Sequence, residues 1–486
     1  MPQSFEAFFF LKTLGGIKVN AKNTQERVEY SVSKTIGSNM VVQRNSAFNV
    51  FGKSKNKGAV IYAEFAGEKN CATVDENGKW CVQFSTGEAT KTEQTLKIYA
   101  ENGVATEFSG ILIGDVWVVS GQSNAELNFC VAAVKTPEYQ KEINEKDNIR
   151  VFSQAREDVM SVKDKEDITI AREDVINENY AWKKTTVSDV QPFSALGYYF
   201  AKELSRTVDV PLGMIMAAAG GSTLHELMPA EVAAECGFTE APSVPVCGFY
   251  NSLLHPFTNN SIKGMIYYQG ESESNAGSYK KYAGNLKKTV EGYRKAWGMD
   301  FPFINVQLTT HMGESVTGWN ELPNIRAAQF NAYKEIENSY LVVSRDQNYK
   351  EEDPDWAHPY YKFEIGKRAA AIAASAIYGK CDMEYSASPE PVKVTWQDDF
   401  VFVDFRYVGD GLKLLDGEKL KGFAVLNEAG DDILTCAEIA DKSTVKLKFS
   451  GKGEKVQYCM FHNGIIELAN LGNSGNFPAP AFEILK

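Results

Sequence analysis

The first part of the chain shows short runs in which apolar and polar positions alternate. Between Tyr30 and Leu112, the runs AFNVFGKS, GAVIYAEFAG, KWCVQFS and QTLKIYA are separated by the turn sequences KSKNKG and DENG. A period of two is typical of strands with one buried face, and several short strands between turns favour an antiparallel sandwich. We therefore expect an N-terminal β-sandwich domain over residues 30–110.

From Ile111 the pattern changes to continuous apolar runs that alternate with helical stretches. The runs are ILIGDVWVVS, PLGMIMAAAG, IKGMIYYQG, PFINVQL and SYLVVSRD, and the helical stretches include FSALGYYFAKELSRT and YAGNLKKTVEGYRKAW. Uninterrupted apolar strands with helices between them predict a parallel sheet covered on both faces. A last helix is expected from about Tyr360 to Tyr378, with Pro359 at its first turn. We assign residues 111–385 to this three-layer α/β/α domain.

The remaining segments are assigned by composition. The sequence SASPEP is expected to be a linker, and the alternation that returns in VKVTW, FVFVDFRYV, TVKLKFS and VQYCMF predicts a second β-rich domain over residues 386–486. Residues 135–190 are charged and weakly periodic, with IRVF as a possible strand, and are interpreted as an elaborated connection, most simply a solvated surface excursion. Residues 1–29 form an N-terminal extension in which we identify no signal peptide.

Composition narrows the range of partners. The 486 residues are 44% hydrophobic and carry a net charge of −12, which argues against nucleic acid or an anionic membrane as a partner. No apolar run is long enough to span a membrane. A cytoplasmic location is expected because no signal peptide is identified. The eight cysteines are scattered without metal-binding spacing, which favours reduced thiols; Cys71 and Cys81 alone flank a predicted turn and are possible hairpin partners.

Ser123 is the candidate nucleophile. It lies in GDVWVVSGQSNAEL, where a buried strand ends and a turn leads towards a helix. Open α/β sheets place their chemistry at the carboxyl ends of strands, so this hydroxyl is expected at the functional edge. The alternative is that Ser123 is an ordinary turn or N-cap residue. The motif differs from the G-x-S-x-G elbow, because Ala125 occupies the last glycine position.

The candidate base is His358, chosen partly by elimination. A serine nucleophile needs a proton acceptor with a pKa near neutrality, usually a histidine. In DPDWAHP, Asp355 precedes His358 by three residues, which brings a carboxylate to the ring Nδ1 and leaves Nε2 for the serine. The alternative is that this D-x-x-H sequence is only a surface turn or a capping pair. Asp346 and Asp353 are competing candidates for the carboxylate that orients His358. The other histidines are His225, His255, His311 and His462.

Two further strand ends offer donors for an oxyanion hole. The segment AAAGGSTLHE has paired glycines whose backbone N–H groups can approach a ligand closely. The segment IYYQGESESNAG places the side-chain amide of Gln269 after another apolar strand. Read alone, each segment is an ordinary strand-to-loop turn, but together with the two preceding motifs they form a set at the ends of successive strands.

Taken together, these segments resemble the sialate O-acetylesterase family of SGNH hydrolases. GDVWVVSGQSNAE, AAGGSTLHE, FYNSLLHPF with IKGMIYYQGESES, and DWAHP are similar to the family's four blocks, and the likeness extends from about Val32 onward. The resemblance implies an SGNH-type, flavodoxin-like fold, with Ser123 as nucleophile and His358 and Asp355 completing its triad. It implies an oxyanion hole of the Ser123 and Gly221 N–H groups, with Gly220 as the fallback, and the Gln269 amide.

The resemblance also has departures, and it extends to substrate contacts. Ala125, His225 and Leu227 replace residues common in the family, which we expect to affect the acyl or sugar pocket rather than the catalytic groups. Polar residues in or beside the matched segments are further candidates for substrate binding: Gln122, Asn124, Glu271 and Arg326.

The expected activity is removal of acetyl groups from O-acetylated sugars through an acyl-enzyme, without a metal or organic cofactor. The resemblance puts O-acetyl sialic acid first, with acetylated xylan or another plant glycan as the alternative. A non-catalytic carbohydrate-binding protein on an esterase scaffold is the alternative of another class, and the intact Ser123, Asp355 and His358 argue against it. The oligomeric state stays open.

Overall fold

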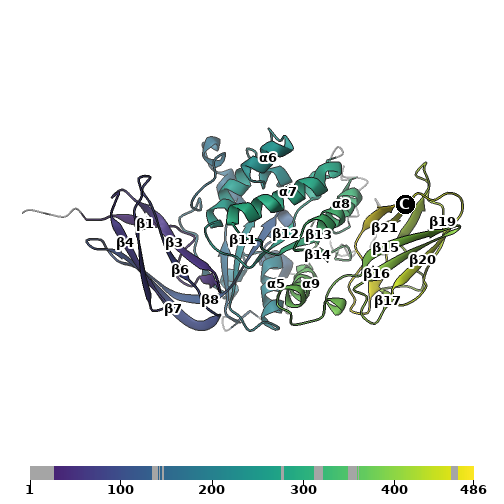
Figure 1. The fold of residues 1–486 in the computed structure, drawn as a ribbon, viewed down its shortest axis with the longest axis horizontal. Coiled ribbons are helices and arrows are strands. Elements are labelled where there is room, and N and C mark those ends of the chain that lie inside the picture. Colours follow the sequence, from purple (N-terminus) through teal and green to yellow (C-terminus); the bar gives the residue numbers. More distant parts are fainter. Residues whose placement is uncertain are drawn as a thin grey trace, which may run out of the picture.

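One long strand, β8 (Thr106–Gly121), joins the N-terminal part of the chain to the central sheet (Figure 1). Its burial alternates from Thr106 to Ser109 and is continuous from Gly110 onward, which matches the change of pattern in the sequence. The expected boundary between residues 110 and 111 therefore falls inside a strand that both parts share. The computed structural model describes residues 27–133, 141, 143–144, 147–274, 278–310, 321–347, 358–359, 361–460 and 469–486.

The N-terminal strands form two groups. One sheet has the order β1-β3-β6, and the other side is formed by β5, β4 and β7, which continue onto the first half of β8. Cys71 and Cys81, on neighbouring strands, are both free thiols. The strands are β1 (Tyr30–Val32), β2 (Val41–Gln43), β3 (Ala47–Ser54), β4 (Val60–Phe65), β5 (Glu68–Thr73), β6 (Lys79–Ser85) and β7 (Thr90–Ala100).

The central sheet is parallel, as its continuous apolar strands predicted. Its order is β9-β11-β8-β12-β13-β14, with β10 antiparallel at the β9 edge, and every residue of β11, β12 and β13 is buried. Strand β9 comes from the segment interpreted as a surface excursion, so that segment in fact completes the sheet. The strands are β9 (Ile149–Ser153), β10 (Lys183–Lys184), β11 (Leu212–Ala218), β12 (Gly264–Tyr268), β13 (Phe303–Gln307) and β14 (Ser339–Val343).

Helices cover both faces of this sheet, with α6, α7 and α8 on one side and α5 and α9 on the other (Figure 1). The last helix begins at Lys362 rather than Tyr360 and continues through a π turn to Ile377. No helix in the described part of the chain is both long and apolar enough to cross a membrane. The helices are α1 (Ser123–Glu126), α2 (Phe129–Ala133), α3 (Arg156–Met160), α4 (Val187–Val190), α5 (Ala195–Ser205), α6 (Ala230–Cys236), α7 (Tyr279–Trp297), α8 (Leu322–Glu335) and α9 (Lys362–Ile372). Single 3₁₀ or π turns are η3 (Lys165–Ile168), η4 (Leu224–Glu226), η5 (Tyr250–Leu254), η6 (His255–Phe257), η7 (Glu271–Glu273), η8 (Ala373–Ile377) and η9 (Met383–Tyr385).

The second β-rich domain is confirmed after the α/β part. The expected linker is not a free tether, because Ser386, Ser388 and Glu390 are buried and Glu390 pairs with Arg406 and Lys334. The strands are β15 (Glu390–Gln397), β16 (Phe400–Arg406), β17 (Leu412–Leu414), β18 (Phe423–Leu426), β19 (Leu434–Ile439), β20 (Thr444–Phe449), β21 (Lys455–Tyr458), β22 (Leu471–Asn473) and β23 (Phe482–Leu485).

Arg345 ties this domain to the β14 edge of the central sheet. Its guanidinium is fully buried and donates to the carbonyl oxygens of Ala469, Leu471 and Ala479, at 2.5, 3.1 and 3.0 Å. A buried guanidinium that satisfies several carbonyls fixes orientation as well as contact. The C-terminal domain is therefore packed against the α/β domain at a defined position.

Candidate active site

The nucleophile turn follows directly from the end of β8. Gly121 has φ +128°, and a Cβ atom there would lie 2.1 Å from the carbonyl oxygen of Tyr268, so only glycine fits between β8 and β12. Gln122 is the N-cap of α1, and Ser123 is its first helical residue and half-buried. The alternative that Ser123 serves as the N-cap is therefore wrong.

Strand register brings the other predicted segments to the same edge. Gly121 of β8 pairs with Ala218 of β11 and with Tyr268 of β12. Gly220 follows β11 and Gln269 follows β12, so both lie beside the nucleophile turn. Because β8 and β12 are neighbours whose following connections lead to opposite sides of the sheet, this edge is the switch point at which open α/β sheets bind ligands.

The two glycines after β11 differ in what their N–H groups can do. The Gly220 N–H donates to Glu126 Oε2 at 2.6 Å, so it is occupied. The described residues offer no acceptor to the Gly221 N–H, and a Cβ at Gly221, where φ is +75°, would meet nothing within 4 Å. Burial raises the pKa of Glu126 above its ordinary value, although the Gly220 N–H acts against that rise. The arrangement favours Gly221 over Gly220 as an oxyanion donor.

Gln269 is fully buried, with its amide between two acceptors. Its Nε2 lies 3.3 Å from the Ser222 carbonyl oxygen and 3.4 Å from Gln122 Oε1, which are long for hydrogen bonds. On the other side, the Tyr282 hydroxyl donates to the Gln269 carbonyl at 2.8 Å and to Oε1 at 3.2 Å. The side chain is also hydrogen-bonded to the buried carboxylate of Glu273: burial raises the pKa of Glu273, and hydrogen bonds from the Leu224 N–H and the Gln269 side chain act against the rise.

Pro359, the residue after His358, is connected to the nucleophile turn by a buried hydrogen-bonded chain. Lys362 Nζ donates to the Pro359 carbonyl and to Asn124 Oδ1, both at 2.7 Å, and Asn124 Nδ2 donates to Glu271 Oε1 at 2.5 Å. Burial raises the pKa of Glu271, and the Asn124 hydrogen bond together with the charges of Lys362 and His358 partly offset the rise. His358 is thus close enough to interact electrostatically with the Glu271 carboxylate.

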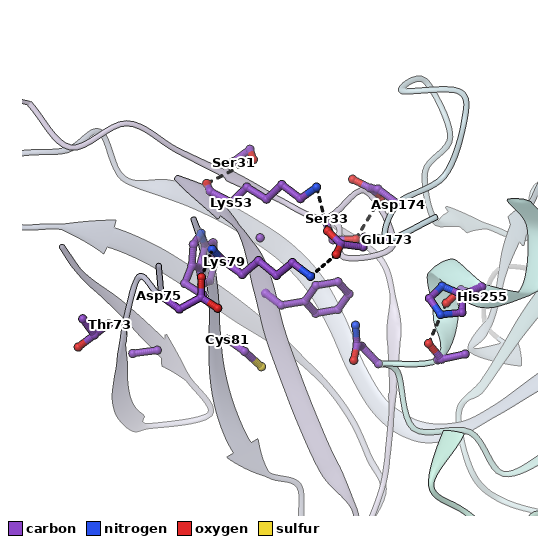
Figure 2. Close-up of a pocket in the computed structure, with 16 residues that line it drawn as sticks. Ser31, Ser33, Lys53, Thr73, Asp75, Lys79, Cys81, Glu173, Asp174 and His255 are labelled. Atoms are coloured by element: carbon purple, nitrogen blue, oxygen red, sulfur yellow. Dashed lines mark hydrogen bonds and ion pairs between the residues drawn. The ribbon is translucent and has the colours of Figure 1, made fainter. Parts of the chain in front are cut away.

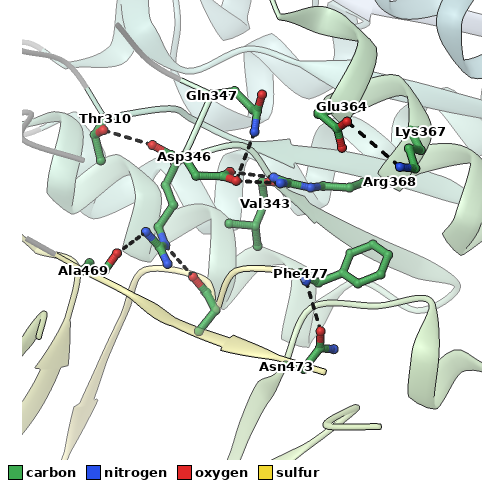
Figure 3. A network of polar contacts seen from close by, with 12 residues as sticks. Thr310, Val343, Asp346, Gln347, Glu364, Lys367, Arg368, Ala469, Asn473 and Phe477 are labelled. Carbon is green, nitrogen blue, oxygen red and sulfur yellow. Dashed lines mark hydrogen bonds and ion pairs between the residues drawn. The ribbon is translucent and has the colours of Figure 1, made fainter. Parts of the chain in front are cut away.

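Of the three aspartates that could orient the imidazole of His358, the structure describes Asp346. Asp355 and its competitor Asp353 lie outside the described residues. Asp346 is paired with Arg368: both of its carboxylate oxygens accept hydrogen bonds from the Arg368 guanidinium at 2.6 Å (Figure 3). Burial alone would raise the pKa of Asp346, but the hydrogen bonds and charge of Arg368, with the charge of Arg345, hold it below its ordinary value. Asp346 is therefore a structural ion pair.

The expected substrate contacts are more buried than that role requires. Gln122, Asn124 and Glu271 are at most 4% exposed. The Oε1 atom of Gln122 accepts from the Gly270 and Ser272 N–H groups at 3.3 and 3.2 Å. Arg326 is fully buried and donates to the Thr309 carbonyl at 3.2 Å. We interpret these side chains as positioning residues rather than substrate contacts.

Two of the three positions at which the chain departs from the family lie in the hydrophobic core. Ala125 and Leu227 are fully buried in the main hydrophobic cluster, so they do not line an open acyl or sugar pocket. His225 is half-buried and stacks on Phe238 with ring centroids 4.4 Å apart, and burial lowers its pKa. The expectation that all three shape the pocket is therefore wrong for Ala125 and Leu227.

Sequence reasoning missed two residues of this site. Glu126 lies three residues after Ser123, and its spacing of one helical turn was a usable signal. Lys362 gave no signal, because a lysine at a helix start is normally exposed and its burial depends on the tertiary fold. Within the described residues, no cluster of histidine, cysteine or acidic side chains could hold a metal ion.

A large cavity lies away from this edge, between the β-sandwich and the connection that follows β9 (Figure 2). Its volume is about 660 Å³, and ion pairs of Lys53 and Lys79 with Glu173 cross it. None of Ser123, Gly221, Gln269 and His358 lines it. Size alone therefore does not identify the reactive site of this molecule.

Comparison with known proteins identifies a family of carbohydrate esterases. Residues 113–374 match the family model described as carbohydrate esterase, sialic acid-specific acetylesterase. The human sialate O-acetylesterase is 24% identical over 310 residues, covering 58% of this chain and 57% of that protein; the mouse protein is 24% identical over 344 residues, covering 58% and 60%. The chain thus spans less than two thirds of the length of these relatives.

A solved structure shows the same fold over almost the entire chain. The carbohydrate acetylesterase from Xanthomonas citri is similar with a TM-score of 0.80 and 24% identity, covering 94% of this chain and 99% of that one. The expected SGNH-type α/β/α fold with flanking β-rich domains is therefore confirmed.

Proposed function

Because the chain belongs to the sialic acid-specific acetylesterase family of carbohydrate esterases, we propose that it hydrolyses acetyl esters of O-acetylated sugars, with Ser123 as nucleophile. The observation that carries the proposal is the strand register at Gly121, which gathers Ser123, the glycine pair and Gln269 at one sheet edge. The hydrogen bonds of Lys362 to Asn124 and to Pro359, the residue after His358, support the inclusion of His358 in the proposed site.

The proposed reaction has two steps. His358 takes the proton as Ser123 Oγ attacks the acetyl carbonyl carbon, and Asp355 holds the imidazole in the right tautomer and stabilises its cation. The tetrahedral oxyanion accepts from the Ser123 and Gly221 N–H groups and the Gln269 amide, each donor contributing about 3 kcal/mol in the transition state. The C–O bond to the sugar then breaks, and His358 protonates the leaving oxygen.

Water completes the cycle. His358 removes a proton from a water molecule that attacks the acetyl-enzyme, and the second tetrahedral intermediate collapses to acetate and free Ser123. Every proton in this sequence moves between the substrate, water and side chains of the protein.

Acetate release from O-acetylated sugars, together with hydrolysis of p-nitrophenyl acetate, tests the proposal. Purified wild-type protein is expected to release acetate from at least one acetylated sugar, and Ser123→Ala to lose this activity while keeping its melting temperature. A wild-type protein that binds sugars but hydrolyses no ester would instead support the non-catalytic carbohydrate-binding alternative.

A further inference from the structure

One buried carboxylate lies where the Gln269 amide and the loop of residues 219–223, which we call the Gly221 loop, come together. Glu273 is the last residue of η7, the turn that follows β12, and it is 9% exposed. Its Oε1 accepts a hydrogen bond at 2.7 Å from the N–H of Leu224, the residue after the Gly221 loop. Its carboxylate also accepts a hydrogen bond from the Gln269 side chain. One side chain therefore bonds to both of these proposed parts of the oxyanion hole.

The contacts of Gln269 determine which way its amide faces. The Tyr282 hydroxyl donates to the backbone carbonyl of Gln269 at 2.8 Å and to its Oε1 at 3.2 Å, so the oxygen end of the amide is turned towards α7. An ionised carboxylate can only accept hydrogen bonds, and an amide nitrogen carries two N–H groups. The contact with Glu273 therefore uses one N–H of the Gln269 amide and leaves the second.

The second N–H of this amide has only weak acceptors. The Gln269 nitrogen lies 3.3 Å from the Ser222 carbonyl oxygen and 3.4 Å from Gln122 Oε1, which are long for hydrogen bonds. Gln122 immediately precedes Ser123, so these acceptors lie on the side of the nucleophile. A charged oxygen is a stronger acceptor than a carbonyl or an amide oxygen. An oxyanion formed when Ser123 attacks can therefore take this hydrogen bond from them.

The turn η7 also holds the Gly221 loop. Ser272 Oγ, one residue before Glu273, donates to the Gly221 carbonyl at 3.2 Å, and the Glu273 carboxylate holds the far end of the loop through Leu224. A Cβ atom at Gly221 would meet nothing within 4 Å, so side-chain packing does not fix this residue. The position of its N–H depends instead on hydrogen bonds to the loop.

The charge of Glu273 is not explained by stability. Burial of a carboxylate carries a desolvation cost, and the charge of a second buried acid, Glu226, adds to it. A hydrophobic side chain of similar size often stabilises a fold as well as a buried charge does. The two hydrogen bonds that the carboxylate accepts are what such a side chain would not supply.

We propose that Glu273 is a positioning residue of the oxyanion hole, which holds the Gln269 amide and the Gly221 loop in the arrangement that receives the negative charge formed when Ser123 attacks. The inference rests on the proposed function, because it assigns Glu273 a part in the same hydrolysis. Glu273 acts through these two groups, so its loss should impair turnover more than substrate binding.

A double-variant cycle on kcat tests this role, with p-nitrophenyl acetate as the substrate. Glu273→Leu removes the acceptor and is expected to lower kcat by about tenfold to a hundredfold, with KM within about twofold. In the Gln269→Ala background, the same change should cost at least about fivefold less, because the amide that it positions is absent. The loss that persists there reports the Gly221 loop.

Two further variants separate this role from stability. Glu273→Gln keeps one oxygen in place of two, so it should fold if Glu273→Leu does not, and in the same cycle it should show a smaller loss of the same kind. Glu390→Gln is the matched control, because Glu390 is a buried carboxylate, 4% exposed, that pairs with Lys334 and Arg406 away from the site. It should lower the melting temperature and leave kcat unchanged.

The outcomes distinguish this inference from the proposed function. Equal fold-losses in the two backgrounds, or unchanged kcat per folded molecule in both Glu273 variants, would overturn the inference and leave the esterase proposal intact. A wild type that hydrolyses neither p-nitrophenyl acetate nor any acetylated sugar would overturn the proposed function, and the inference with it.

Discussion

The ammonium group of Lys362 lies 2.7 Å from Oδ1 of Asn124, the residue that follows the proposed nucleophile. The same ammonium is 2.7 Å from the carbonyl oxygen of Pro359, the residue that follows the proposed base. Lys362 is fully buried, and its charge is matched through the Asn124 amide by the buried carboxylate of Glu271. One cation thus bonds both to the residue after the proposed nucleophile and to the residue after the proposed base.

Replacing Lys362 with Met should therefore impair turnover more than substrate binding. A misplacement of about 1 Å between nucleophile and base costs about a hundredfold in rate, so kcat is expected to fall by about tenfold to a hundredfold with KM little changed. The matched control is Lys367→Met, which removes a lysine that is 55% exposed on the same helix and should be silent.

The double variant Lys362→Met with Glu271→Gln separates positioning from buried charge. The single change leaves Glu271 without its counter-charge and should lower the melting temperature. The double change removes both charges, so the melting temperature should recover while kcat stays low. Recovery of kcat together with stability would show that Lys362 only balances charge.

Gln269→Ala is expected to lower kcat by about a hundredfold to a thousandfold with a small change in KM, because an oxyanion donor acts mainly in the transition state. Gln269→Glu should be at least as harmful, since an ionised carboxylate repels the developing charge. The contacts of Gln269 with Tyr282 also predict a lower melting temperature. Normal turnover per folded molecule in the Ala variant would show that Gln269 is no oxyanion donor and only stabilises the turn before Gly270 and Glu271.

Asp355→Asn should reduce kcat by roughly 10³–10⁴-fold, because the amide favours the wrong imidazole tautomer. The competing carboxylates supply the comparison. Asp353→Asn is expected to leave kcat nearly unchanged. A large loss of kcat in Asp353→Asn with a silent Asp355→Asn would move the assignment from Asp355 to Asp353.

Asp346→Asn should affect stability instead of turnover, with a defined pH dependence. The pKa of Asp346 is lowered in the folded state, so its ion pair with Arg368 stabilises the fold above the unfolded pKa, about 3.9, and this contribution is lost as the pH falls through the folded pKa. The melting temperature of the wild type should exceed that of Asp346→Asn at pH 7, and the difference should shrink below about pH 4. A difference that does not depend on pH would show that ionisation of Asp346 is not its source.

The sequence predicted those features that depend on local pattern. Continuous apolar runs identified β8, β11, β12, β13 and β14, and their strand ends identified the turn with Ser123 and the amide of Gln269. The run IRVF was a possible strand and is β9, but the weak periodicity around it favoured a surface excursion over a strand of the central sheet. The boundary between the first two domains was missed because β8 keeps strand character through both of them.

Features that depend on the tertiary fold could not be predicted. Whether Gly220 or Gly221 has an available N–H depends on where the Glu126 carboxylate lies, and nothing in the glycine pair itself reports that. The burial of Lys362 and Asn124 depends on α9 packing beside the nucleophile turn. Residues that looked like substrate contacts by position, Gln122 and Arg326 among them, are buried by neighbours that are distant in the chain.

The most direct test of the shared action of Ser123 and His358 is a double-variant cycle on kcat for acetate release. Ser123→Ala and His358→Ala should each lower kcat by several orders of magnitude with the melting temperature preserved. Because the two side chains work as one unit, the double variant should be little worse than either single variant. Losses that multiply in the double variant would contradict a common mechanism for these two residues.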